Sequence, residues 1–106
     1  MRAPDKRPAR GFVGVVRAEL YLPGATSLKD KRMLLRSMRA RLTRSYGASF
    51  AEVGYQGLWQ RAGVILAIAA SDLKKLKQDL DAVEAYLVDQ ECEVLEAYQE
   101  VHEVDA

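Results

Sequence analysis

The sequence predicts an α+β domain with the element order βαββαβ, a four-stranded antiparallel sheet and both helices on one face of it. Three observations support this prediction. Apolar residues make up 49% of the 106 residues, which is enough for one compact core. Two segments have the apolar spacing of an amphipathic helix, and four have the β-branched, apolar character of strands. Each helical segment lies between two strand segments, which gives the predicted order.

The chain is predicted to begin its folded part with a strand and a helix. Residues 12–22 alternate between an apolar face and a mixed face, as a half-buried strand does. Ser27 is predicted to cap a helix that runs to about Ser45, because Asp30 follows it at the spacing of a capping box. Gly47 is predicted to end this helix, since glycine readily adopts the left-handed conformation found there.

The rest of the chain is predicted to add two strands, a second helix and a last strand. Residues 48–55 form a short strand, and residues 62–70 are apolar almost throughout, which is typical of a central strand. A second helix is predicted to start at Ser71 or Asp72, and residues 93–104 form the last strand. The second helix has apolar residues at helical spacing: Leu73, Leu76, Leu80, Val83 and Leu87.

This order matches the ferredoxin-like arrangement, which predicts strand order 4-1-3-2 with the first and third strands in the centre. Such a sheet brings the turn after the first strand close to the connection between the second and third strands. We therefore expect residues 23–32 and 56–61 to be spatial neighbours. Residues 11–106 are predicted to form a single domain, and residues 1–10, with two prolines and many charges, a disordered basic tail.

Charge is separated along the chain. Residues 1–44 contain 12 Lys or Arg and three acids, whereas residues 72–106 contain three Lys and 11 acids.

No apolar run is long enough to cross a bilayer or to act as a signal peptide, which predicts a cytoplasmic protein without a membrane partner. One Cys and one His are too few for a usual zinc site, and no phosphate-binding loop motif is present, so no metal or cofactor is expected. No acid–base or nucleophile set can be assembled, which predicts a protein that is not an enzyme.

The first predicted helix is strongly basic, with seven Lys or Arg and one acid within 16 residues. One arc of about 80° holds four of these cations: Lys29, Arg32, Arg36 and Arg39. Lys31 falls inside the apolar arc, from which it could extend outward or face a site. A cationic stripe of this kind could follow the phosphates of RNA or DNA. A solvated helix face, or a surface for an acidic protein, would produce the same pattern.

The connection between the second and third strands has an unusual composition for a hairpin loop. Such loops prefer small polar residues, whereas this one contains Trp59, Gln60 and Arg61. Tryptophan and arginine can stack on bases or anchor a partner. The alternative interpretation is structural: Trp59 covers the open end of the core, and Arg61 pairs with Glu52 or with an acid near the C-terminus.

The sheet face opposite the helices is predicted to carry several apolar side chains: Val13, Val15, Tyr21 and Tyr98. Sheet-to-sheet dimerisation or a bound partner would explain them. Scattered apolar residues are also common on ordinary protein surfaces.

Four segments together resemble the YlxP-like family of small uncharacterised bacterial proteins. They are Val13-Gly-Val15, Ser27-Leu-Lys-Asp-Lys-Arg32, Glu52-Val-Gly-Tyr-Gln56 and Leu58-Trp-Gln-Arg-Ala62. The resemblance covers nearly the whole predicted domain and implies a ferredoxin-like fold but no established activity. Because family members are often encoded beside translation and ribosome-maturation factors, it also implies an association with ribosomal RNA or the ribosome. Gly57 departs from the family, which commonly has Asp there, so this chain lacks any contact that this acid makes in the family.

The leading hypothesis is therefore a non-enzymatic protein that binds ribosomal RNA or the ribosome through its basic helix. The alternative is a dimeric small-ligand or protein-interaction module that uses the open sheet face. The candidate RNA contacts are phosphate-binding cations and a group for stacking and hydrogen bonding: Lys29, Lys31, Arg32, Arg36 and Arg39, then Trp59, Gln60 and Arg61.

Overall fold

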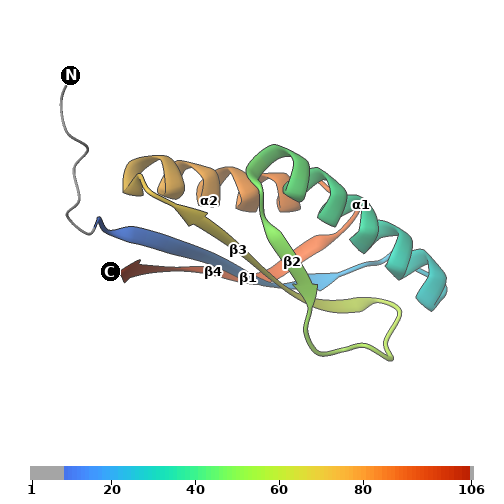
Figure 1. The fold of residues 1–106 in the computed structure, drawn as a ribbon. Helices are drawn as coiled ribbons and strands as arrows, with labels where there is room; N and C mark the ends of the chain where they lie inside the picture. Colours follow the sequence, from blue (N-terminus) through green and yellow to red (C-terminus); the bar gives the residue numbers. More distant parts are fainter. Residues whose placement is uncertain (1–8, 106) are drawn as a thin grey trace, which may run out of the picture.

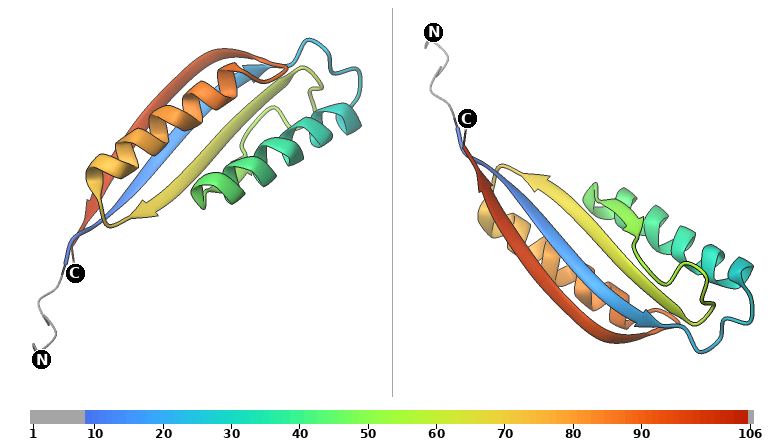
Figure 2. Two further views of the ribbon diagram at one scale, coloured as in Figure 1. Left: turned by 90° about the horizontal axis from the view of Figure 1, so that it is seen from above. Right: turned by 90° about the horizontal axis from the view of Figure 1, so that it is seen from below.

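The structure, a computed structural model, describes residues 9–105 and has the predicted βαββαβ order (Figure 1). The predicted tail, residues 1–10, lies mostly outside the described residues. The elements are β1 (Gly11–Tyr21), α1 (Leu28–Tyr46), β2 (Ser49–Glu52), β3 (Arg61–Ala70), α2 (Leu73–Val88) and β4 (Glu93–Val104). The strands form one antiparallel sheet of order β2-β3-β1-β4, which is the predicted order read from the other edge. Both helices pack on the same face of it, and the prediction of the fold is confirmed (Figure 2).

The core lies between the two helices and the covered face of the sheet. On β1 the buried positions alternate, as the strand period requires, and Val16, Ala18 and Leu20 face the helices. The helices contribute seven fully or almost fully buried apolar side chains: Leu35, Met38, Leu42, Leu76, Leu80, Val83 and Leu87. Burial of a side chain of this size contributes about 1.5–3 kcal/mol, so this layer supplies much of the stability that fixes α1 over the sheet. No described helix combines the length and apolar character needed to span a bilayer.

Local hydrogen bonds set both ends of α1 where the sequence predicts them. The Ser27 hydroxyl oxygen accepts a hydrogen bond from the backbone N–H of Asp30, at 3.1 Å. The Asp30 carboxylate in turn accepts bonds from the backbone N–H and the hydroxyl of Thr26, which lower its pKa and keep it charged. Gly47 ends the helix with φ of 64°, in the left-handed region that glycine adopts without strain. These caps fix the rotation of α1, and with it the direction of its basic side chains.

Strand β2 is shorter than predicted, and this part of the prediction is wrong. Its ladder with β3 ends at Glu52, followed by one further backbone bond from the N–H of Val53 to the carbonyl of Gly63, at 2.7 Å. Gly54 and Tyr55 then have positive φ values of 77° and 56°, which turn the chain out of the sheet. Residues 53–60, hereafter the β2–β3 loop, are therefore a separate structure rather than an extended hairpin.

The face of the sheet away from the helices is not covered by any other element of residues 9–105 (Figure 2). Strand register places Val13, Val15 and Tyr98 on this open face, where the valines are half-buried and the tyrosine is exposed. Their predicted position is confirmed.

Candidate nucleic-acid interface

The two segments expected to be neighbours do meet at one end of the sheet (Figure 2). The side-chain amide of Gln60 donates hydrogen bonds to the carbonyls of Pro23 and Ala25, at 3.3 and 3.4 Å. The backbone N–H of Leu22 donates to the carbonyl of Gln60, at 2.9 Å. The predicted proximity is confirmed, but the amide N–H groups of Gln60 are used inside the protein, where they join the β2–β3 loop to the turn before α1.

Lys31 does not lie on the surface, so its predicted role as a phosphate contact is wrong. Its side chain is only 1% exposed, and its ammonium forms an ion pair with Glu52 Oε2 at 2.8 Å. The same ammonium donates to the backbone carbonyls of Tyr55, at 2.8 Å, and Arg61, at 3.2 Å. A buried ammonium is costly unless its donors are used, and here they are. Lys31 therefore attaches α1 to both ends of the β2–β3 loop.

Arg61 belongs to a polar cluster on the open face, together with Glu19 and Tyr55. Its guanidinium lies 4.7 Å from the centre of the Tyr55 ring and 3.3 Å from a carboxylate oxygen of Glu19. The Tyr55 hydroxyl donates to the other oxygen of Glu19, at 2.9 Å. The alternative prediction, a pair with Glu52 or a C-terminal acid, is wrong because Arg61 pairs with Glu19, which lies two residues along β1 from Tyr21, the ladder partner of Arg61. These contacts hold Tyr55 in its left-handed conformation, which costs about 1–3 kcal/mol in a residue other than glycine.

Trp59 lies at the exposed end of the β2–β3 loop. Its side chain is 53% exposed, and it borders an open hollow formed by its neighbours in residues 57–61. The structural alternative, that Trp59 covers the end of the core, is therefore wrong. Because Lys31, Gln60 and Arg61 hold the loop in place, the exposed Trp59 side chain remains available for stacking.

Three of the predicted cations line a groove between α1 and β2. The groove encloses about 150 Å³, and we call it the α1–β2 groove; its lining is Arg32, Leu35, Arg36, Arg39, Phe50 and Glu52. Arg39 donates to the backbone carbonyl of Phe50, at 3.2 Å, and its guanidinium lies 5.8 Å from the centre of the Phe50 ring. Within residues 9–105, Arg32 and Arg36 are exposed and have no ion-pair partner. Lys29 is exposed as well, one turn before the groove.

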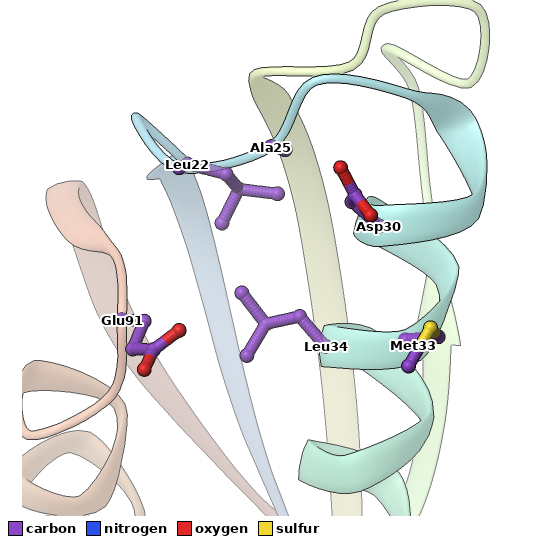
Figure 3. Close-up of a pocket in the computed structure, with 7 residues that line it drawn as sticks. Leu22, Ala25, Asp30, Met33, Leu34 and Glu91 are labelled. Carbon is purple, nitrogen blue, oxygen red and sulfur yellow. The ribbon is translucent and has the colours of Figure 1, made fainter.

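A second cavity, of about 340 Å³, lies between the first turns of α1 and the connection from α2 to β4. Figure 3 shows the side chains of Leu22, Leu34 and Glu91 directed into it, with Met33 on the outer side of the helix. Its two charged residues, Asp30 and Glu91, are both acidic, so it does not attract phosphate. The groove on the other side of α1 is the better candidate for an anion.

Cys92, the single thiol of the chain, is half-buried beside the core, and its Sγ lies 3.3 Å from the carbonyl oxygen of Leu87. Burial raises the pKa of this thiol, whereas a reactive cysteine usually has a lowered pKa. Cys92 therefore has the environment of a structural residue.

The geometry defines a small ferredoxin-like α+β domain with a basic groove beside its edge strand and an exposed tryptophan on an anchored loop. The chain belongs to the family described as "Protein of unknown function (DUF503)", whose model matches residues 13–99. It is also 31% identical over 76 residues to "Uncharacterized protein YlxP" of Bacillus subtilis (strain 168). The matched stretch covers 72% of this chain and 83% of that protein. The resemblance to the YlxP-like family is thus confirmed.

Among solved structures, the chain is similar to a C-terminal segment of the alpha subunit of aIF2 from Pyrococcus abyssi. The TM-score is 0.44 and the sequence identity 10%, over 92% of this chain. The chain spans about half of that structure, 51% of its length.

Proposed function

We propose that this protein is a non-enzymatic, cytoplasmic RNA-binding protein whose partner is ribosomal RNA, alone or within the ribosome. The observation that carries the proposal is the α1–β2 groove, where the exposed guanidiniums of Arg32 and Arg36 have no acidic partner among the described residues. Arg39 and Lys29 extend this cationic surface along the helix. Exposed cations in a row fit the repeated phosphates of a nucleic acid better than a single small ligand.

The distribution of the remaining charges supports the same surface. Lys31 is neutralised by Glu52 and Arg61 by Glu19, while Arg10 lies 3.2 Å from Glu103. Among the described residues, Arg10 and Lys31 are thus the cations of the basic N-terminal part that form ion pairs. Among residues 9–105, the arginines of α1 form no ion pair, and the first turn of α1 lies at the end of the sheet where the β2–β3 loop carries Trp59. A strand of RNA could therefore contact phosphate-binding and stacking groups together.

Filter binding of a ribosomal RNA fragment over a salt series tests this proposal. Each phosphate contact contributes about 0.7 to 0.9 to the slope of log affinity against log salt, so Arg36→Ala should reduce the slope by roughly this amount. Arg44→Ala is the matched control, since Arg44 is exposed on the last turn of α1 and does not line the groove. An absence of binding at low salt, or equal slopes for the two variants, would contradict the proposal.

A second candidate function is a dimeric interaction module, which the uncovered valines of the open face favour. If a second copy covers Val13 and Val15, a replacement of Val15 by Lys should convert a dimer into a monomer, because it would bury a charge in the interface. Light scattering on the original protein and on this variant measures the difference. A monomer at every concentration of the original protein removes this candidate.

A further inference from the structure

We infer that the α1–β2 groove holds one unstacked guanine base of the bound RNA, with the adjacent phosphates on Arg32 and Arg36. This inference rests on the proposed function and adds the part of the RNA that the groove recognises. It follows from the size of the groove, from the position of its arginines and from the single carboxylate in its lining.

The size of the groove limits what can enter it. Its 150 Å³ is small beside the roughly 300–1,000 Å³ of pockets that enclose a whole small-molecule ligand. One planar ring system is a better match. The apolar lining comes from Leu35, which is buried, and Phe50, which is partly buried against the core. The planar guanidinium of Arg39 lies over the Phe50 ring, 5.8 Å from its centre, and its outer face is a flat surface on which an unpaired base can stack.

The charges of the groove differ between its rim and its lining. Arg32 and Arg36 are exposed, so their guanidiniums can reach a phosphate that stays near solvent. Glu52 also lines the groove, and its carboxylate repels a phosphate that moves further in. The neutral base is thus the part of a nucleotide that fits beside Glu52, while the phosphate remains with the arginines.

Glu52 is positioned to read the edge of that base. Its Oε2 atom is buried against the Lys31 ammonium, and the side chain as a whole keeps 24% of its exposure. Because Lys31 is itself bonded to two backbone carbonyls, the carboxylate is held in place before a ligand arrives. An ionised carboxylate accepts hydrogen bonds and cannot donate one, so it selects a base with donors on its exposed edge.

Guanine is the base that satisfies this condition best. Its Watson–Crick edge presents two adjacent donors, the N1–H and the 2-amino group, and both can bond to Oε1, the oxygen of Glu52 that is not buried against Lys31. Adenine and cytosine each place an acceptor beside their amino group, and uracil places its one N–H between two carbonyls; these acceptors would be repelled by Glu52. Hydrogen bonds to the Watson–Crick edges of splayed-out bases are the common mode of sequence-specific RNA recognition.

The test uses the full-length protein and a fluorescently labelled RNA hairpin with one unpaired position, occupied in turn by guanine, inosine, adenine, cytosine or uracil. Fluorescence anisotropy gives the affinity of each RNA. Discrimination by a good base contact is worth about 1–3 kcal/mol, so guanine should bind roughly 5- to 150-fold more tightly than adenine. Inosine lacks the 2-amino group, so the affinity of its RNA should lie between those of the guanine and adenine RNAs.

Two variants separate the groove from the rest of the interface. Glu52→Gln should reduce the preference for guanine over adenine to about twofold, since an amide both donates and accepts. Because this change also weakens the Lys31 pair, Phe50→Leu is the second variant: it keeps that pair and should weaken guanine binding while leaving the salt slope unchanged. Folding of both variants is checked by circular dichroism.

The outcomes distinguish this inference from the proposed function. Salt-dependent binding with equal affinity for all five bases overturns the guanine site and leaves RNA binding in place. No binding of any RNA at low salt overturns both. A guanine affinity that Phe50→Leu leaves unchanged, or a guanine preference that a folded Glu52→Gln retains in full, also overturns the inference, since guanine is then bound elsewhere.

Discussion

Replacement of Lys31 by alanine is expected to destabilise the protein by about 3 kcal/mol, near the lower end of the cost of breaking a buried ion pair. The variant leaves the Glu52 carboxylate without its counterion and the carbonyls of Tyr55 and Arg61 without their donor. Unsatisfied buried polar groups of this kind are costly. The lower end applies because Glu52 keeps 24% of its side-chain exposure, so water partly replaces the ammonium. Urea unfolding followed by circular dichroism measures the change.

The neighbouring residue supplies a control with the same change of charge. Arg32→Ala removes an exposed cation, and its free energy of unfolding should stay within about 0.5 kcal/mol of the original protein. Ethylammonium in the buffer should partly restore Lys31→Ala, because it can occupy the vacated ammonium position, and should have little effect on Arg32→Ala. Equal stability of the two variants would show that the Lys31 contacts contribute nothing to folding.

The elements that the sequence predicts well are those determined by neighbours in the chain. Ser27 and Gly47 set the two ends of α1 through hydrogen bonds that span three to five residues. The apolar spacing in α2 likewise depends only on the helical period, and the buried residues follow it. Strand order followed from the element order, since the ferredoxin-like connection leaves few alternatives.

The contacts around Lys31 could not be predicted in the same way. Periodicity places Lys31 on the buried side of α1, and this signal was present in the sequence. Its partners, however, are backbone carbonyls 24 and 30 residues further along the chain. Because every residue has a backbone carbonyl, the residue types do not show which of them accepts the bond. The pair between Arg61 and Glu19 depends on strand register for the same reason. The end of β2 was missed because the positive φ of Tyr55 is stabilised by these distant contacts rather than by a local signal.

These contacts also change how the shared motifs of the family can be interpreted. The segment with Lys31 and the segment with Arg61 meet through hydrogen bonds that position the β2–β3 loop. Lys31 and Arg61 therefore serve to hold the loop in place. The exposed residues that the loop and the helix present are Trp59 and the arginines of the α1–β2 groove, which are the residues of the proposed RNA interface.

Gly63→Ala is expected to have an effect similar in size to that of Lys31→Ala, because it changes where β2 joins β3. A Cβ at Gly63 would overlap the backbone carbonyl of Val53, which cannot move aside as a flexible side chain would. Overpacking typically costs about 1–3 kcal/mol. A shift of Val53 would also break its 2.7 Å hydrogen bond to Gly63, for roughly 1 kcal/mol more.

Gly57→Ala is the control for this substitution, since a Cβ at Gly57 meets no atom within 4 Å and its φ is not in the left-handed region. We expect the free energy of unfolding of Gly57→Ala to lie within about 0.5 kcal/mol of that of the original protein. Gly63→Ala should lower the urea midpoint and also change the Trp59 fluorescence of the folded state, because the β2–β3 loop begins at Val53. Equal midpoints and equal fluorescence for the two variants would mean that the close contact between Gly63 and Val53 does not position the loop.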